Sequence, residues 1–378
     1  MDHYDIAVIG LGALGSGAAY HSAAKGAKVL GLEQFEFGHV RGASHDTSRI
    51  VRTSYGAPEY VKLAQSSYRD WAELERRTGQ QWLHITGGII VFPRDSPNKA
   101  RDWTGSLDAN GQPYELLTTA EVKARWPQFT LPEGAETVYT ADMGLVHASK
   151  SVAAMQYAAR SLGAVLKENT RVDRVVPQAK GGAIIETSRG RFSARKVIIT
   201  ADAWANKLLA PLGAEIPLDV MQEQVTYFKP QNPEEYDGQK FPVWAYAGEH
   251  FFYGFPAFGE PTIKAGRDVS YNRMDPDKRS FVHSEGLLKE LEGLMGSFIP
   301  GKGQTLRTVT CQYAITPERQ FIISPLEKHQ DVLVGLGGGH AFKFAPTFGR
   351  VLAELAIDGK TTDDISKFGI PKAPESKL

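Results

Sequence analysis

The sequence has little cysteine, no excess charge of either sign and no long apolar run. Cys311 is the only cysteine among 378 residues, which excludes an intrachain disulfide and a metal site of several thiolates; no metal ligand set is predicted. Basic and acidic residues each number 43, so we expect neither nucleic acid nor an anionic membrane as partner. No run approaches the roughly 20 apolar residues of a membrane helix, and the polar start Met1–Asp5 argues against a secretory signal.

What the chain does contain is typical of a globular enzyme with more than one domain. Its length exceeds the usual size of a single hydrophobic core and predicts two domains. Hydrophobic residues make up 42% and charged residues 23% of the chain, an ordinary balance for a soluble enzyme.

The N-terminal residues predict a strand, a helix and a second strand. The apolar run Ile6–Ile9 is followed by Gly10–Gly15, which has the spacing G-x-G-x-x-G and opens an alanine-rich helix. A second apolar strand, Lys28–Leu32, ends at Glu33. This order of elements is the one that dinucleotide binding requires.

Each position in this motif has a physical role in binding a dinucleotide. Gly10 permits a tight turn, Gly12 lets the backbone approach a pyrophosphate, and Gly15 lets helix and strand pack closely. The carboxylate of Glu33 is placed to accept hydrogen bonds from a ribose. The motif predicts a bound dinucleotide without a 2′-phosphate and leaves FAD and NAD both open.

The segment Gly42–Arg52 is polar and cationic. Arg49 and Arg52 are three residues apart, a spacing that would put both on one side of a helical turn. They would then clamp an anion or offset negative charge on a reduced flavin. A solvated basic turn explains these residues equally well.

The same segment resembles a known family. The run G-x-S-H-x-x-x-R-x-x-R is similar to the flavin-proximal segment of monomeric sarcosine oxidase, N-methyltryptophan oxidase and peroxisomal L-pipecolate oxidase, which are FAD-dependent amine oxidases. The resemblance extends in order through further motifs: Tyr60–Leu63, Trp71–Glu75, Thr86–Gly88, Arg125–Pro127, Gly144–Val146, Val197–Thr200, Tyr253–Pro256, Cys311–Pro317 and Gly339–Phe344.

The resemblance implies an α/β fold (α+β overall), with a Rossmann-like FAD-binding domain of discontinuous segments and an antiparallel-sheet substrate domain. We expect residues 1–84, 143–213 and 305–370 in the FAD-binding domain, 85–142 and 214–304 in the substrate domain, and 371–378 as a tail. The aromatic stretches Val225–Phe228, Val243–Tyr246 and Phe251–Phe255 predict strands of the second domain, and an amphipathic helix is predicted around Phe281–Leu294.

The resemblance also implies a cofactor, FAD, and its attachment. Cys311 matches the cysteine that forms a thioether to the flavin 8α-methyl group, although a lone cysteine is by itself more typical of a buried structural residue. The other residues that match cofactor contacts are Gly10, Gly12, Gly15, Glu33, Ser44, Ser48, Val172, Gly339 and Lys343.

Three residues match the catalytic set of the family. Lys264 matches a lysine that helps the reduced flavin react with oxygen, where a fixed cation stabilises developing negative charge. The alternative for a lysine in an apolar strand is a surface side chain that only packs its stem. His45 and Arg49 match residues that border the flavin.

The substrate site is implied by five residues. Arg52 and Lys343 match the pair that holds the substrate carboxylate. The guanidinium of the arginine offers two parallel hydrogen bonds, and the ammonium group of the lysine adds a point charge. Tyr253 and Tyr313 match aromatic walls of the pocket. Asp268 stands where the sarcosine and methyltryptophan oxidases carry a histidine, and a carboxylate there favours a cationic or hydroxylated substrate.

We therefore expect an FAD-dependent oxidase of secondary amino acids such as sarcosine, N-methyl amino acids or L-pipecolate. Hydride transfer to flavin and reoxidation by O2 give hydrogen peroxide and an imine, which hydrolyses to an aldehyde and an amine. The fructosyl amino acid oxidases carry an acid near the position of Asp268 but lack the His45–Arg49–Arg52 spacing, and rank second. A further departure is Asp202, where glycine is usual near the nucleotide.

Two alternative functions, from other classes of protein, fit the sequence less well. An NAD-dependent dehydrogenase has no use for Cys311, and the zero net charge disfavours a flavoprotein that modifies tRNA. The tail Ser376, Lys377 and Leu378 matches a signal read by the peroxisomal import receptor. It predicts a peroxisomal protein, which we expect to be a monomer.

Overall fold

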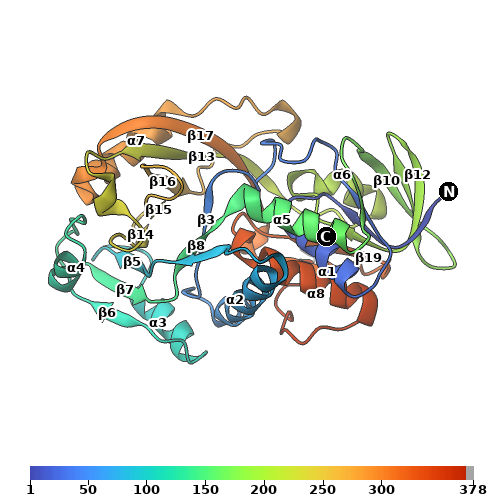
Figure 1. Ribbon diagram of the computed structural model, residues 1–378, viewed down its shortest axis with the longest axis horizontal. Helices are drawn as coiled ribbons and strands as arrows, with labels where there is room; N and C mark the ends of the chain where they lie inside the picture. The colour runs from blue at the N-terminus through green and yellow to red at the C-terminus, as the bar shows by residue number, and fades with distance from the viewer. Residues whose placement is uncertain (372–378) are drawn as a thin grey trace, which may run out of the picture.

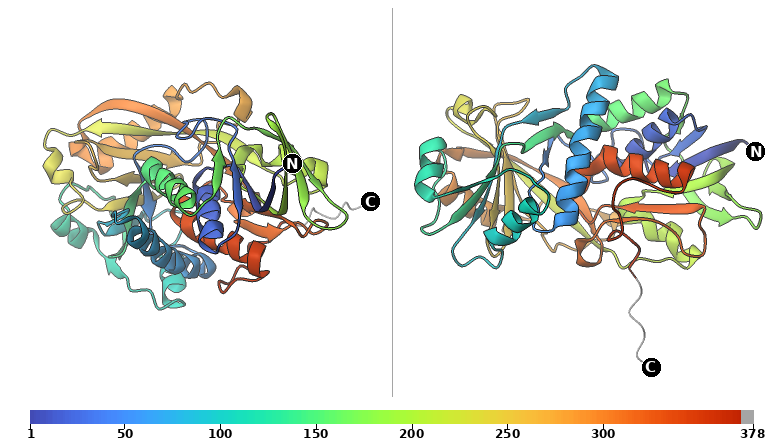
Figure 2. Two further views of the ribbon diagram at one scale, coloured as in Figure 1. Left: turned by 45° about the vertical axis from the view of Figure 1, so that its right-hand side comes forward. Right: turned by 90° about the horizontal axis from the view of Figure 1, so that it is seen from below.

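Two eight-stranded sheets organise residues 1–371, the part of the chain that the computed structural model describes (Figure 1). The predicted import signal, Ser376 to Leu378, lies outside the described residues. The views in Figure 2 show the two sheets at opposite ends of a long molecule, with the helix α2 (Pro58–Thr78) between them.

The first sheet has a parallel centre. Its main order is β10-β11-β12-β1-β2-β9, with β19 pairing β12 and β18 pairing β19. The central pairs β12–β1, β1–β2, β2–β9 and β12–β19 are parallel. The strands are β1 (His3–Ile9), β2 (Val29–Leu32), β9 (Val165–Lys167), β10 (Val172–Pro177), β11 (Ala183–Thr187), β12 (Gly190–Ile199), β18 (Ile322–Pro325) and β19 (Val332–Leu336).

Both faces of this sheet are covered, which explains the continuous apolar runs of its central strands. Alternate residues of β1 point into different clusters: Ile6 and Val8 pack with the helices α1, α5 and α8, whereas Ala7 and Ile9 pack with α6 on the other face. The helices are α1 (Ala13–Ala24), α5 (Ala148–Ser161), α6 (Ala205–Leu209) and α8 (Ala345–Asp358).

The second sheet is antiparallel except for one pair. Its order is β17-β13-β16-β15-β14-β5-β7-β6, and only β14 and β5 run parallel. Its strands are β5 (Gly88–Phe92), β6 (Glu115–Leu117), β7 (Glu136–Thr140), β13 (Asp219–Lys229), β14 (Val243–Ala247), β15 (Phe251–Phe255), β16 (Ile263–Asp268) and β17 (Gln304–Ile315). The remaining helices are α3 (Ala100–Asp108), α4 (Thr119–Arg125) and α7 (Glu285–Phe298).

A small third sheet joins segments that are far apart in the sequence. It has the order β3-β8-β4, formed by β3 (Ser48–Val51), β8 (Gly144–His147) and β4 (Leu83–Ile85). Strand β3 carries Arg49, so this small sheet holds the end of the Gly42–Arg52 segment in place.

The fold class predicted from the sequence is confirmed, with two differences in detail. The helix expected around Phe281–Leu294 begins only at Glu285, because the hydroxyl of Ser284 accepts a hydrogen bond from the N–H of Leu287 and caps it. Residues 305–315, which we expected with the FAD-binding segments, lie in the second sheet because β17 pairs along the whole of β13. The division into domains stays a prediction. No helix within residues 1–371 is long and apolar enough to cross a membrane.

Candidate active site

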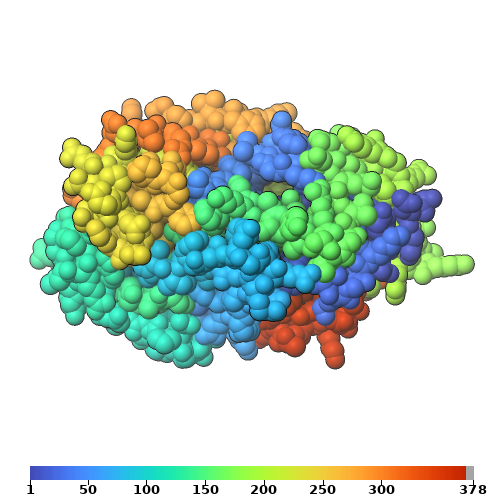
Figure 3. Space-filling model, viewed as in Figure 1, coloured from blue at the N-terminus to red at the C-terminus, as the bar shows by residue number. Residues whose placement is uncertain are grey.

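A cavity of about 600 Å³ runs between the two large sheets. Figure 3 shows the surface hollowed between the blue and the green parts of the chain. One end is formed by the β1–α1 turn and the end of β2, and the other by β15, β16 and the glycine-rich segment after β19. The predicted site residues on its wall are Gly10, Gly12, Glu33, Ser44, His45, Arg49, Arg52, Val172, Tyr253, Asp268, Tyr313, Gly339 and Lys343.

The β1–α1 turn forms the first end of the cavity. Gly10 has a φ of +88°, a backbone conformation that glycine adopts without steric cost. A Cβ atom on Gly15 would lie 1.8 Å from the carbonyl oxygen of Gly10, so only glycine allows the helix to start this close to the strand. The N–H of Ala13, in the first turn of α1, donates to the hydroxyl of Ser44 at 2.9 Å. The glycine pattern predicted the tight turn at Gly10 and the close packing at Gly15.

Glu33 lies where the sequence placed it, at the end of β2. Its side chain is buried and lines the cavity. One carboxylate oxygen accepts from the N–H of Leu11 at 2.9 Å and the other from the N–H of Phe35 at 3.1 Å. These bonds hold the carboxylate rigidly at the first end of the cavity.

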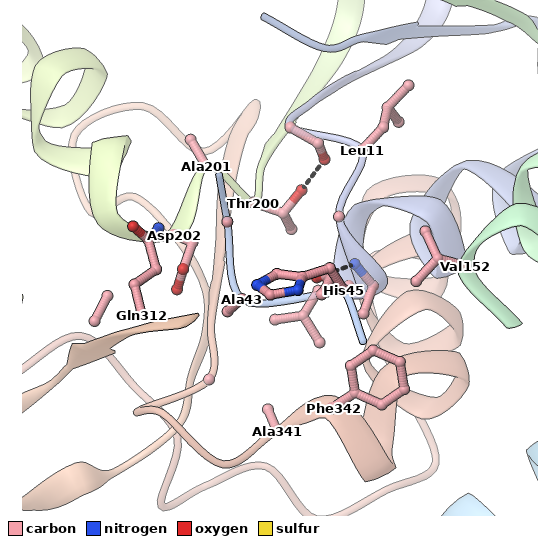
Figure 4. Close-up of a pocket in the computed structure, with 18 of the residues that line it drawn as sticks. Leu11, Ala43, His45, Val152, Thr200, Ala201, Asp202, Gln312, Ala341 and Phe342 are labelled. Atoms are coloured by element: carbon pink, nitrogen blue, oxygen red, sulfur yellow. Dashed lines mark hydrogen bonds between the residues drawn. The ribbon is translucent and has the colours of Figure 1, made fainter. Parts of the chain in front are cut away.

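Several buried polar atoms on the cavity wall have no hydrogen-bond partner within residues 1–371. They are Nε2 of His45, Oδ2 of Asp202 and both side-chain polar atoms of Gln312. Figure 4 shows Asp202 and Gln312 next to each other on one side of the pocket and His45 between them and Val152. Because buried polar groups are nearly always hydrogen-bonded, this wall fits a ligand with hydroxyl and amide groups, such as the ribityl chain and ring of FAD.

Asp202 also has an unusual backbone and ionisation. Its φ is +46°, which agrees with the glycine usual at this position. Burial raises the pKa of its carboxyl group to about 6, because no nearby cation offsets the loss of solvent.

Arg49 lies in a strand and not in the helical turn that its spacing from Arg52 suggested. Strand β3 pairs with β8, and this tertiary pairing decides the local structure. The guanidinium of Arg49 donates to the carbonyls of Ser48 at 2.9 Å and Ala43 at 3.1 Å. Both arginines still line the cavity, because Arg52 follows the end of the strand.

Lys264 lies behind the cavity wall and does not line the cavity. Its side chain is buried, and its Nζ lies 4.2 Å from the ring centroid of Phe255, which does line it. The ammonium group donates to Oδ2 of Asp46 and to the carbonyl of Ser48, both at 2.9 Å. The alternative of an exposed lysine is therefore wrong.

Cys311 is buried in β17 and is likewise absent from the wall of the large cavity. It lines a second cavity of about 20 Å³ together with His45, Arg49, Tyr253 and Tyr313, which all line the large cavity as well. Burial raises the pKa of its thiol to about 11, while the charge of Arg49 opposes that shift. Two further predicted site residues, Gly15 and Ser48, do not line the large cavity either.

Arg52 and Lys343 present two cations at the far end of the cavity. Arg52 donates to the carbonyl of Ser54 at 2.5 Å, and Lys343 donates to the carbonyl of His340 at 2.8 Å. Within residues 1–371 neither forms an ion pair with a carboxylate. Burial, followed by the charge of Arg52, lowers the pKa of Lys343 well below its usual range, and a bound anion would reverse that shift.

Asp268 lines the cavity but is already paired. Its two oxygens accept from the guanidinium of Arg319 at 2.7 and 3.2 Å. Arg319 and the preceding Glu318 both have positive φ, as does Val269 next to Asp268, so the ion pair joins two strained segments. Burial raises the pKa of Tyr253 and of Tyr313, which keeps both phenols protonated.

Four residues of this region were missed in the sequence. Asp46 and Arg319 are the counter-ions of Lys264 and Asp268. Gln312 leaves its amide unpaired beside Asp202. Glu223 lies opposite Cys311 in the β13–β17 register, and burial raises its pKa to about 7. The residues that these four contact are distant from them in the sequence. The only sequence signal was for Asp46 and Gln312, which lie close in the chain to the predicted site residues Arg49 and Cys311.

The fold and this cavity define an FAD-dependent oxidoreductase. A family model described as FAD dependent oxidoreductase matches residues 5–355. The chain belongs to this family, in the branch that contains the sarcosine oxidases. Its class is that of FAD-dependent oxidases that act on CH–NH groups with oxygen as acceptor.

Individual relatives match over nearly their whole length. Peroxisomal sarcosine oxidase from Homo sapiens is 31% identical over 99% of this chain and 97% of its own. Monomeric sarcosine oxidase from Streptomyces avermitilis is 34% identical, over 97% of this chain and 96% of its own. The structure of NikD, an unusual amino acid oxidase, superposes with a TM-score of 0.87 at 27% identity, over 99% of both chains.

Proposed function

We propose that the protein oxidises secondary amino acids such as sarcosine, other N-methyl amino acids or L-pipecolate. The observation that supports this most directly is the pair of basic side chains, Arg52 and Lys343, on the cavity wall without a carboxylate partner within residues 1–371. Two unpaired cations fit the carboxylate that every amino acid carries.

In this proposal Arg52 and Lys343 bind the substrate carboxylate and so orient the carbon–nitrogen bond toward the cofactor. Bound FAD supplies a two-electron acceptor that passes the electrons on to oxygen. The protonated phenols of Tyr253 and Tyr313 wall the site and exclude water. No side chain is needed as an obligatory base, because the substrate reacts as its neutral amine.

The Asp268–Arg319 pair supports secondary amino acids over fructosyl amino acids. A carboxylate that faced the cavity alone would attract a cationic amine or hydrogen-bond the sugar hydroxyls of a glycated substrate. Arg319 takes both oxygens of Asp268 in a two-pronged ion pair, which leaves less of its charge for a ligand.

We further propose that FAD is attached covalently through the sulfur of Cys311. The residues around the thiol support this: His45, Arg49, Tyr253 and Tyr313 line both the small cavity beside Cys311 and the large cavity. Arg49 favours the thiolate that attachment requires, against the effect of burial. Peroxisomal import through Ser376, Lys377 and Leu378 and a monomeric state stay predictions from the sequence.

The proposal is tested by anaerobic mixing of the purified protein with sarcosine, L-pipecolate or a fructosyl amino acid. Loss of the flavin absorbance with a secondary amino acid, and not with the fructosyl compound, is the expected result. Loss with the fructosyl compound alone would identify the second candidate and make Asp268 the residue that selects the substrate.

A further inference from the structure

We propose that Asp46 is a positioning residue, the counter-ion that holds Lys264 in place and keeps its ammonium group charged for the reaction of the reduced enzyme with oxygen. The inference rests on the proposed oxidase function and on the role in the reaction with oxygen that the resemblance to the sarcosine oxidases implies for Lys264. It adds a residue from the middle of the Gly42–Arg52 segment that no motif marks.

The contacts of Asp46 place its carboxylate between two cations. Its Oδ2 lies 2.9 Å from Nζ of Lys264 and 3.6 Å from a terminal nitrogen of Arg49. Its Oδ1 accepts a hydrogen bond from the hydroxyl of Tyr227. The side chains of Lys264 and Asp46 are only 3% and 7% exposed, so solvent screens this pair little.

The position of Asp46 has a side chain although its backbone conformation favours glycine. Its φ is +90°, a conformation that favours glycine. The N–H and the hydroxyl of Ser149 both donate to its carbonyl at 3.1 Å and hold the backbone there. A residue with a side chain at such a position costs stability, and the ion pair offsets that cost.

Lys264 depends on this carboxylate for its charge. Burial lowers the pKa of the ammonium group to about 8, and Asp46 opposes that shift whereas Arg49 adds to it. The carboxylate itself stays ionised, because Lys264 and Arg49 hold its pKa far below the usual range although burial would raise it. Without Asp46, Lys264 would lose its proton at a lower pH.

The other titratable groups around the pair do not replace Asp46. His45 is neutral at pH 7, since burial lowers its pKa to about 4. Burial keeps the thiol of Cys311 and the phenols of Tyr227 and Tyr253 protonated. Arg307, stacked 3.8 Å from the ring centroid of Tyr227, adds a further cation and pairs with Glu260. Tyr313 is protonated as well.

The consequence concerns the step that uses oxygen. Anionic reduced FAD, O2 and one proton give oxidised FAD and H2O2, with two electrons passing to oxygen. A nearby ammonium group stabilises the negative charge that oxygen gains. The rate of this step should therefore follow the protonation of Lys264 and fall as the pH rises through about 8, the pKa of that group.

The test compares the wild type with Asp46→Asn and Asp46→Gly. Both remove the charge, but only glycine relieves the backbone, so a common effect is one of charge. Lys264 is titrated by NMR in the holoenzyme with ¹³C-labelled lysine, the signal being assigned by its loss in Lys264→Met. In parallel, dithionite-reduced enzyme is mixed with oxygen across the same pH range, which requires no amino acid substrate.

We expect the midpoint of both profiles to fall by at least about one pH unit, a tenfold change in the proton affinity of Lys264, equally in the two variants. Asp70→Asn, which removes a buried partner of Arg350 that does not line the cavity, should leave both midpoints unchanged. Unchanged midpoints in the Asp46 variants, or a shift in Asn without one in Gly, would overturn the proposal. The assignment of substrate is tested separately, because bleaching by amino acids does not enter these measurements.

Discussion

At the scale of single residues, the site is set by which charges are paired and which are not. Lys264 and Asp268 each have a counter-ion, Asp46 and Arg319. Arg52 and Lys343 have none within residues 1–371. Two basic side chains without a carboxylate partner at one end of the cavity favour a ligand carboxylate at that place.

Arg52→Gln should weaken substrate binding. Loss of a charge-assisted hydrogen bond costs about 1.5–3 kcal/mol, which corresponds to an increase in Kd of roughly tenfold to a hundredfold. The measurement is the dependence of anaerobic flavin reduction on substrate concentration. The surface change Arg76→Gln, on α2, serves as the control, and an equal Kd in the wild type and Arg52→Gln would show that the carboxylate binds elsewhere.

At the scale of elements, the sequence predicted those helices and strands that are determined by interactions between residues close together in the chain. The strand, glycine turn and helix from His3 to Ala24 were predicted because their signals lie within one short segment. The strand β3 was not, since its pairing with β8 joins residues almost a hundred positions apart. The ion-pair partner of Lys264 was not predicted for the same reason, because Asp46 is 218 residues away in sequence.

Gly15→Ala should disrupt the turn between β1 and α1. The added Cβ would meet a backbone carbonyl at 1.8 Å, so helix and strand must separate, at a cost of about 3 kcal/mol, the upper end for overpacking. Thermal unfolding and FAD content both report this change.

The matched control is Gly293→Ala in α7, where a Cβ meets no atom within 4 Å. Alanine is the better helix former by up to about 1 kcal/mol, so this variant should be slightly more stable than the wild type. A Gly15→Ala protein with normal stability and a full complement of FAD would refute the role given to this turn.

At the scale of the whole molecule, the cofactor cavity lies between the two large sheets and takes its wall from both. Each sheet contributes a buried polar group without a hydrogen-bond partner: Asp202 follows β12 of the first sheet, and Gln312 lies in β17 of the second. FAD binding should therefore stabilise the two parts of the molecule together.

Cys311→Ser makes this effect measurable, because it should render FAD removable. The wild type should show flavin fluorescence on a denaturing gel and the variant none. Adding free FAD at a thousand times its Kd should then stabilise the stripped variant by about 4 kcal/mol, seen as a higher unfolding temperature. A fluorescent band from the variant would exclude Cys311 as the attachment point.

The central claim is that Arg52 and Lys343 recognise the carboxylate of a secondary amino acid. Sarcosine and dimethylamine test it most directly, because they differ only in that carboxylate. Each is mixed anaerobically with the holoenzyme, and the loss of flavin absorbance is followed in time. We predict that sarcosine bleaches the flavin and that dimethylamine at equal concentration does so at least about a hundredfold more slowly, the loss expected when the charged contacts go unmade. Equal rates with the two amines would contradict the account.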